Sequence, residues 1–425
     1  MRQGYRPRTT AGDKTICLAF PEGDEYERLL ADGAAYRQYL NAQIEQHPEL
    51  FPAEIVKGYW FHGVIVSEKQ GLKQRRILLK ANRQAYQIRP ASMMPYMVGP
   101  SEFVEKGLYL RERGVSYDAI AHVLGRSPAY WYQLTQSLSR ISIVGATVKD
   151  LSRLPAHLSA DEKVTWWRRL QVYVAVTAAQ GCILGSALSR HADTVSLTAA
   201  YGEFQREAQA AVPDYQPQSV NVDGWDATQK SWQQLFPSIV IMRCFLHVVL
   251  GIQSRCRSNP TLLDDLTTDL WHLFHSLNPA QFGQRLRRLL EWALHPDLEM
   301  LDSVRQKLLK LKALAPNFKQ TFAHPEAART SNAVDRVMNY QDRVLYSMQY
   351  FHGTEAAAQK ALRAMALLWN FHLYIPKVRA RSPNVNSAFE GLNGFRYHDH
   401  WLQNLLIAAS LNGRNHGNFV SHKIA

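Results

Sequence analysis

Two kinds of hydrophobic pattern alternate along the chain. Over residues 20–57 and 101–139, apolar positions recur every three to four residues, which predicts helices. Over residues 58–90, the apolar positions fall into short β-rich runs separated by turn residues, which predicts strands. Residues 140–156 have neither period and are interpreted as a linker. The N-terminal third is therefore expected to be an α+β region.

Beyond the linker, the pattern predicts strands and helices in a definite order. Three β-rich runs joined by tight turns are followed by an amphipathic helix, a strand, a helix and a buried strand. This β-β-β-α-β-α-β order is the ribonuclease H-like arrangement, in which α/β units extend three antiparallel strands. The expected strands cover 157–167, 170–178, 181–189, 218–225 and 238–245, and the expected helices cover 194–211 and 227–236.

The remaining chain predicts helices only. Residues 260–325 show helical periodicity without any strand pattern, which indicates an all-helical insertion. We therefore expect an α/β ribonuclease H-like core, a mixed sheet flanked by helices, with this insertion and an N-terminal α+β region that includes a helix-turn-helix. The expected boundaries are 1–57 (basic arm and helices), 58–100 (small β-rich basic module), 101–140 (helix-turn-helix), 155–260 (first part of the core), 261–328 (helical insertion) and 329–425 (core completion and C-terminal tail).

Composition narrows the class of protein. The 425 residues include 49 Lys and Arg against 36 Asp and Glu, a net charge of +13, which suggests a polyanionic partner, either nucleic acid or an acidic membrane face. No apolar run reaches the roughly 18–20 residues of a membrane span, and the N-terminus lacks the apolar segment of a secretory signal. The four cysteines form no CxxC pair, and no GxxxxGK[ST] loop is present. We expect a cytoplasmic, nucleoid-associated protein with no membrane association and no nucleotide cofactor.

Basic residues are concentrated in the predicted strands of the β-rich module. Residues 69–89 contain seven Lys or Arg and no acid. Such a patch can be an ordinary solvated face, or it can contact phosphates, because Lys and Arg that neutralise phosphates release counterions. The DNA-binding candidates here are Arg75, Arg76, Lys80 and Arg83; Lys69, Lys73 and Arg89 complete the seven.

A second DNA-binding candidate lies at residues 116–137. Ser116 can cap one short helix, Gly125 can make a tight turn, and Ser127 with Pro128 can begin a second helix. This is the spacing of a helix-turn-helix, whose second helix lies in a DNA groove, although short helical pairs also occur in many other folds. The candidate contacts near the start of the second helix are Arg126, Ser127, Tyr130 and Trp131.

Candidate chemistry comes from carboxylates. Asp161 lies on the first strand of the core and Asp223 ends the fourth, and these strands are neighbours in a ribonuclease H-like sheet. Two close carboxylates repel each other unless a cation lies between them, and oxygen ligands suit Mg²⁺ or Mn²⁺. A third acid is needed for a second ion. Asp335, one turn into a predicted helix, is our choice and Glu390 is the rival; Asp342 and Glu355 are weaker candidates.

Four segments make the chain resemble DDE/D transposases, in particular those related to Mutator-type and other bacterial insertion-sequence enzymes. They are the Asp-bearing segment 220–237, the Cys244-Phe-Leu-His247 segment, the helical insertion, and the segment 330–336, Thr-Ser-Asn-Ala-Val-Asp-Arg. The families mostly have Glu where this chain has Asp335. Cys244 and His247 can be metal ligands, or a packed Cys and a hydrogen-bonded His that brace the core near Asp223.

The resemblance implies a function. It implies two Mg²⁺ or Mn²⁺ ions held by Asp161, Asp223 and Asp335. It also implies binding of double-stranded DNA at transposon terminal inverted repeats, phosphodiester hydrolysis that frees a 3′-hydroxyl, and strand transfer into target DNA. At least a dimer is expected, because two transposon ends must be held together. The alternatives are a DNA-binding regulator built on an inactive transposase core, and a ribonuclease H-like nuclease or resolvase.

Overall fold

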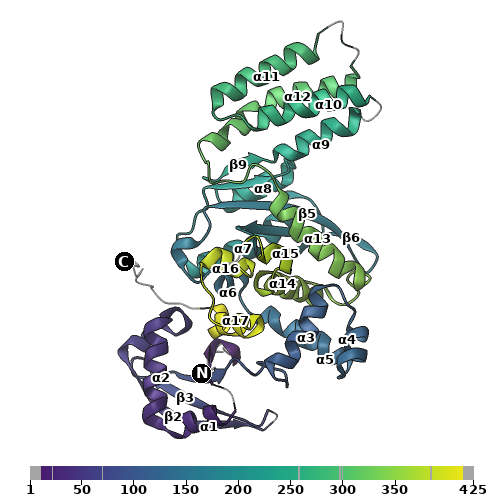
Figure 1. The fold of residues 1–425 in the computed structure, drawn as a ribbon. Helices are drawn as coiled ribbons and strands as arrows, with labels where there is room; N and C mark the ends of the chain where they lie inside the picture. Colours follow the sequence, from purple (N-terminus) through teal and green to yellow (C-terminus); the bar gives the residue numbers. More distant parts are fainter. Residues whose placement is uncertain are drawn as a thin grey trace, which may run out of the picture.

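The protein is a mixed α/β structure with two mixed sheets and many helices (Figure 1). Its coordinates are a computed structural model that describes residues 11–21, 23–68, 70–256, 259–295, 298, 300–382 and 385–414. Most of the predicted basic arm, Lys69 of the basic patch and the end of the tail lie outside the described residues. Within the described residues, no helix is long and apolar enough to cross a membrane.

The N-terminal region contains a four-stranded sheet in the order β1-β4-β3-β2. Its strands pair antiparallel except β1 and β4, which are parallel. The patterned strands were predicted, but β1 was not, because it has only four residues and is held by pairing with a distant strand. The elements are β1 (Thr15–Leu18), α1 (Asp24–Ala31), α2 (Gly33–Gln46), β2 (Tyr59–Ser67), β3 (Leu72–Leu79) and β4 (Ala85–Pro90).

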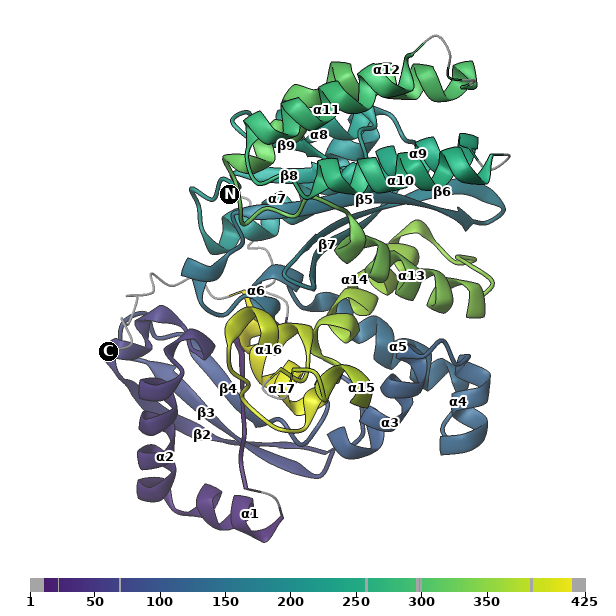
Figure 2. The same cartoon turned by 45° about the horizontal axis from the view of Figure 1, so that its top comes forward.

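The second sheet has five strands in the order β7-β6-β5-β8-β9. β5, β6 and β7 pair antiparallel, and β8 and β9 extend the sheet in parallel with β5. One face of the sheet packs on α7 and α8, and the other on α13 and α14 (Figure 2). The elements are β5 (His157–Trp167), β6 (Leu170–Ala179), β7 (Cys182–Ser189), α7 (Thr194–Ala211), β8 (Ser219–Val222), α8 (Asp226–Leu235), β9 (Val240–Arg243), α13 (Asn332–Ser347) and α14 (Glu355–Phe371).

A long helical region separates β9 from α13. It stands apart at one end of the molecule (Figure 1) and has a hydrophobic core of its own. Its helices are amphipathic, with leucines at helical spacing facing this core. The elements are α9 (Phe245–Cys256), α10 (Pro260–Phe274), α11 (Pro279–Ala293) and α12 (Asp302–Lys319).

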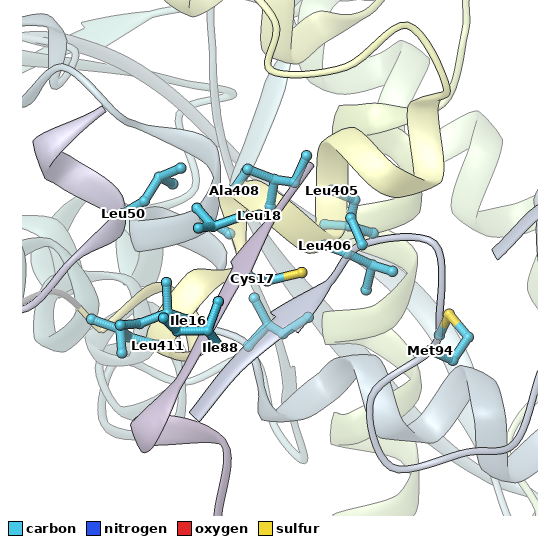
Figure 3. Packing of buried hydrophobic residues seen from close by; sticks show 14 of the residues in the cluster. Ile16, Cys17, Leu18, Leu50, Ile88, Met94, Leu405, Leu406, Ala408 and Leu411 are labelled. Carbon is cyan, nitrogen blue, oxygen red and sulfur yellow. The ribbon is translucent and has the colours of Figure 1, made fainter. Parts of the chain in front are cut away.

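The C-terminal helices fasten the N-terminal sheet to the rest of the molecule. In Figure 3, Leu411 lies beside Ile16 of β1, and Leu405 and Leu406 lie on the side of β1 toward which Cys17 points. The backbone N–H of Cys17 also donates to the Ser410 hydroxyl, at 3.3 Å. The N-terminal sheet and the C-terminal helices therefore share one core. The remaining helices are α3 (Ser101–Glu112), α4 (Tyr117–Leu124), α5 (Pro128–Ser137), α6 (Ile143–Thr147), α15 (Pro376–Arg379), α16 (Ala388–Asn393) and α17 (Trp401–Ala408).

The interpretation of residues 140–156 as a linker is wrong. This segment contains α6, in which Ile143, Val144 and Ala146 are buried. Gly145 lies so close to the backbone of Gly413 that a Cβ atom there would be 1.7 Å from the carbonyl oxygen. The apolar positions of so short a helix do not reveal a period, so only its packing identifies it as core.

Candidate functional site

Strand pairing places Asp161 and Asp223 side by side. β5 and β8 are parallel, and the last paired residues are Ser159 and Asn221. Asp161 and Asp223 each lie two residues beyond this pair, in the same direction along neighbouring chain segments. Because side chains alternate along a strand, both carboxylates leave the sheet on the same side at its carboxyl edge.

The side of the sheet is identified by the neighbours of Asp161. Asp161 pairs across β5 and β6 with Val176, whose side chain packs under α13 and α14. Two residues further along the same face of β5, Lys163 forms an ion pair with Asp342 of α13. Asp161 therefore faces α13, the helix that carries Asp335 in its first turn.

The chain that leads into α13 runs along the ends of β8 and β9. The Asn221 side-chain amide donates to the carbonyl of Ala328 at 2.9 Å, and the backbone N–H of Phe245 donates to the carbonyl of Arg329 at 3.2 Å. These two bonds return the chain from the helical region to the edge of the sheet where the two aspartates lie. Asp335 is thereby brought to the same edge.

Electrostatics indicate that the three aspartates are close to one another. Burial and, after it, the neighbouring Asp223 carboxylate raise the pKa of Asp161 to about 6, and Asp335 makes a weaker contribution in the same direction. His247 and a hydrogen bond from the backbone N–H of Glu162 act in the opposite direction. Partial burial and like charge thus make ionised Asp161 costly in the absence of a cation.

Cys244 and His247 brace this edge. The backbone N–H of Ser331 donates to the Cys244 sulfur at 3.2 Å, and the Ser331 hydroxyl donates to Asp335 Oδ2 at 3.3 Å. Burial alone would raise the pKa of Cys244, but hydrogen bonds from His247 and Ser331 lower it overall. The contact with Cys244, aided by Asp161, raises the pKa of His247 to about 9. The cysteine therefore joins the starts of α9 and α13, while His247 supplies positive charge beside the acids.

The donor chemistry of the site suits a hard divalent cation, but the site is not a closed cage. Among the described residues, no three His, Cys, Asp or Glu side chains are arranged so that they could hold a metal ion by themselves. Mg²⁺ usually takes only one or two protein carboxylates, and waters and substrate phosphates complete its shell. Asp161 and Asp223 therefore fit an ion that is shared with substrate, while joint ligation by all three predicted acids is not preassembled.

Glu162 is a functional candidate that sequence reasoning missed. It lies on the opposite face of β5 from Asp161, and its Oε1 accepts from the hydroxyls of Tyr201 and Thr228, each at 2.7 Å. Its Oε2 is buried without a partner among the described residues, and burial raises the pKa of Glu162 to about 7. The sequence shows that Asp161 and Glu162 are adjacent acids near the start of a strand. It does not reveal that both are partly buried.

Arg243 at the end of β9 was missed as well. Gly224, directly after Asp223, has φ +103°, and a Cβ atom on it would lie 2.8 Å from an Nη atom of Arg243. The guanidinium donates to Gln229 at 3.4 Å, and its Nε is buried without a partner among the described residues. The glycine is therefore needed both for its backbone conformation and for the close approach of a cation next to Asp223.

Glu390 lies elsewhere. It is buried in α16, and its Oε2 accepts from the backbone N–H of Asn386 at 3.1 Å and forms an ion pair with Arg396 at 3.4 Å. The two weaker candidates also have partners of their own, since Asp342 pairs with Lys163 and Glu355 with Arg190.

The predicted basic patch is divided by the fold. Arg75 lies over the Tyr36 and Phe61 rings and donates to the carbonyl of Leu30. Arg89 is buried and donates to the carbonyl of Met93. Both guanidinium groups therefore have partners within the fold. Of the rest, Lys73 pairs with Glu27, Arg76 is half-buried, and Lys80 and Arg83 are exposed.

The predicted helical pair is present, with the expected caps. The Ser116 hydroxyl accepts from the N–H of Ala119 and begins α4, and the Ser127 hydroxyl accepts from the N–H of Tyr130 and begins α5. Trp131 is buried, and its indole donates to the carbonyl of Gly125 at 3.0 Å.

Of the four predicted DNA-contacting residues in this pair, only Arg126 has a polar group that no hydrogen bond among the described residues occupies. Trp131 holds the pair together and does not face a groove. Tyr130 donates to the carbonyl of Val98, and Ser127 is used by its cap. Arg126 is exposed, with its guanidinium over the Tyr130 ring.

No protein-family model matches this sequence, and no curated protein is significantly similar to it. The function is therefore inferred from the arrangement of residues in this chain.

Proposed function

We propose that this protein is a DNA transposase that cleaves phosphodiester bonds and joins the resulting ends to target DNA. One observation carries the proposal most strongly. The parallel register of β5 and β8 puts Asp161 and Asp223 side by side at one edge of the sheet, and the pKa of Asp161 is raised to about 6 by burial and by Asp223. Perturbed carboxyl groups placed together in this way are typical of sites that act on phosphate esters with a divalent cation.

The order of the strands supports a ribonuclease H-like core. Three antiparallel strands are followed by two that extend the sheet in parallel, in the order β7-β6-β5-β8-β9, with helices on both faces. Asp161 lies on the first strand of this sheet and Asp223 directly follows the fourth, and α13 brings a third aspartate to the same edge after the helical region. Fold alone does not establish activity, so the proposal rests on the acids.

Asp161 and Asp223 would hold Mg²⁺ or Mn²⁺, and Asp335 would complete the set for a second ion. Such ions activate a water or a 3′-hydroxyl and stabilise the leaving oxygen in an in-line displacement at phosphorus. The protein contributes position and charge. Ser331 would orient Asp335, and Arg243 beside Gly224 and His247 beside the acids would add positive charge for a bound phosphate. No covalent protein–DNA intermediate is required.

Binding to DNA is supported by charge. The net charge of +13 favours a polyanion, and exposed Arg126, Lys80 and Arg83 lie on the two modules that were predicted to bind transposon ends. Holding two ends together would require at least a dimer.

The test uses a plasmid that carries the DNA flanking the gene, incubated with the whole protein and Mg²⁺ or Mn²⁺. We expect cation-dependent cleavage and joined products from the wild type, and neither from Asp223→Ala, which should still bind DNA. Asp342→Asn, whose carboxylate pairs with Lys163, is the matched control and should remain active. Cleavage without joining would favour a nuclease or resolvase. Binding without any cleavage would favour a regulator on an inactive core and overturn the proposal.

A further inference from the structure

The hairpin of β5 and β6 continues past the acids, and one of its faces is left bare. Val164 pairs with Tyr173 and Trp166 pairs with Gln171, so these four side chains leave the hairpin on the same face. Trp225, two residues after Asp223, adds its ring at 6.0 Å from that of Tyr173. We call these five residues the outer hairpin face. The opposite face of the hairpin is covered by α13.

The outer hairpin face is unusually exposed for its composition. Trp166 is 43% exposed, Val164 47% and Trp225 38%. Exposed apolar groups that lie together, and not singly, generally mark a contact surface. The face is also ordered, because the Gln171 side chain donates to the Tyr173 hydroxyl at 2.9 Å and the backbone N–H of Trp225 donates to Asp223 at 2.8 Å.

Two arginines form the tip of the hairpin. Arg168 and Arg169 are both exposed and have φ of +49° and +68°, the conformation of a two-residue turn with positive φ at both positions. Asn and Gly are the residues that this turn prefers, so two arginines here are conformationally costly. Neither forms an ion pair among the described residues, and Asp226, the residue after Trp225, is paired with Lys230.

We propose that the outer hairpin face stacks the unpaired bases of a DNA strand that passes through the acidic site, and that Arg168 and Arg169 hold its phosphates. A duplex exposes phosphates and groove edges, whereas rings lying open on a surface match the faces of unstacked bases. Trp166 lies five residues from Asp161, or roughly 17 Å along an extended strand, a distance that a few nucleotides can span, and its side chain leaves the opposite face of β5. A DNA strand that reaches both would therefore cross the edge of β5 beyond Ser159, the last residue that pairs with β8. This inference rests on the proposed function, since it assigns a strand to the same site.

The test measures binding in EDTA, so neither a metal nor cleavage is needed. A labelled single-stranded oligonucleotide is compared with the blunt duplex of the same sequence and with an abasic oligonucleotide of the same length. Trp166→Ala should weaken binding of the single strand about 5- to 100-fold, as expected for loss of base stacking, and should leave duplex binding nearly unchanged. Trp166→Phe should retain most of the affinity. The wild type should bind the abasic strand as weakly as Trp166→Ala binds the normal strand.

A matched control and a second variant keep the result interpretable. Tyr346→Ala removes an aromatic ring of α13 that is 76% exposed and should bind like the wild type. The double change Arg168→Asn and Arg169→Gly suits the turn and should leave folding intact, while it lowers the salt dependence of single-strand binding by about one to two phosphate contacts.

Three outcomes would overturn the inference. The first is unchanged single-strand affinity of Trp166→Ala. The second is an equal loss of affinity for the single strand and the duplex in Trp166→Ala. The third is a lower mass of Trp166→Ala than of the wild type in sedimentation, which would assign the face to contacts between protein copies. If single-strand binding depends on Trp166 but the plasmid assay shows no cleavage, the transposase proposal fails while the base-stacking face stands. If the plasmid is cleaved but single-strand binding does not depend on Trp166, the base-stacking inference fails while the transposase proposal stands.

Discussion

The charged side chains at the edge of the five-stranded sheet and those of the four-stranded sheet have different surroundings. At the edge of the five-stranded sheet, Asp161 and Asp223 are brought together partly out of water, and burial together with the neighbouring Asp223 carboxylate raises the pKa of Asp161 to about 6. In the four-stranded sheet, Arg75 and Arg89 are engaged by carbonyls, rings and a thiol. Both regions carry clustered charges in the sequence. In the first, the charged neighbours of Asp161 include two further carboxylates, whereas in the second, carbonyls, rings and a thiol contact the guanidinium groups.

The difference shows where to look for function. A charged side chain whose hydrogen bonds are filled by its own fold contributes mainly to stability. A group that is partly buried and opposed by a like charge lowers stability and persists where a ligand or reaction uses it. We therefore expect changes at the acids to affect activity, and changes at Arg75 to affect folding.

The largest expected effect concerns the third acid. Asp335→Asn should reduce cleavage on the order of 10³-fold, because phosphoryl transfer depends on charge neutralisation at the reacting phosphate. Glu390→Gln should keep a rate near that of the wild type, since Glu390 contacts Asn386 and Arg396 away from the pair. The plasmid assay measures both rates. If Glu390→Gln loses more cleavage activity than Asp335→Asn while its circular dichroism shows an intact fold, Glu390 and not Asp335 is the third acid.

The second prediction compares the contributions of Arg75 and Arg76 to the free energy of unfolding. Arg75→Ala should lower the free energy of unfolding by about 2–3 kcal/mol, because it removes a packed guanidinium from the rings of Tyr36 and Phe61 and a hydrogen bond to Leu30. Arg76→Ala should change it by about 0.5 kcal/mol or less, as at most surface positions. Urea unfolding measures the two. Equal values would show that Arg75 is not structural.

The third prediction concerns pH. In the folded protein the pKa of Asp161 is about 6, against an ordinary value of 3.8. Between these values the unfolded chain has lost the proton while the folded protein retains it, so stability falls as pH rises from about 4 to about 6 and the deficit then stays constant. Asp161→Asn, which cannot ionise, should be more stable than the wild type at pH 8 by on the order of 1–2 kcal/mol.

Melting curves at pH 4 and pH 8 test this sign directly. The advantage of Asp161→Asn should be small at pH 4, where both proteins are neutral at this position. Mg²⁺ at pH 8 should raise the melting temperature of the wild type more than that of the variant, because a ligand stabilises the state that binds it. A variant less stable than the wild type at pH 8 would contradict the raised pKa.

The smallest effect is expected at three cations of the N-terminal region, the half-buried Arg76 and the exposed Lys80 and Arg83. Replacing Arg76, Lys80 and Arg83 together with Gln should weaken duplex binding about fivefold and lower the slope of log affinity against log salt by about two. Arg206→Gln, which removes an exposed cation of α7 that pairs with Glu203, is the control. An unchanged slope in the triple variant would show that these three residues do not contact DNA phosphates, and the helical pair would then be the remaining DNA-binding candidate.

Local patterns predicted the elements of the five-stranded sheet well. The helix expected over 194–211 is α7 with the same bounds, and β5 covers the expected 157–167. The caps of α4 and α5 were predicted as well, because they depend on residues three positions apart. The same locality explains the failures. β1 and α6 are too short to show a period, and both depend on partners far away in the chain.

The sequence by itself therefore determined which residues can form strands and helices, and which acids could act if they met. Tertiary structure alone decided that Asp161 and Asp223 lie next to each other, that Glu162 is buried on the other face, and that Arg75 and Trp131 belong to packing. The physical reason is that periodicity and capping depend on near neighbours along the chain. The pKa of a carboxyl group and the freedom of a guanidinium depend on groups that only folding brings close.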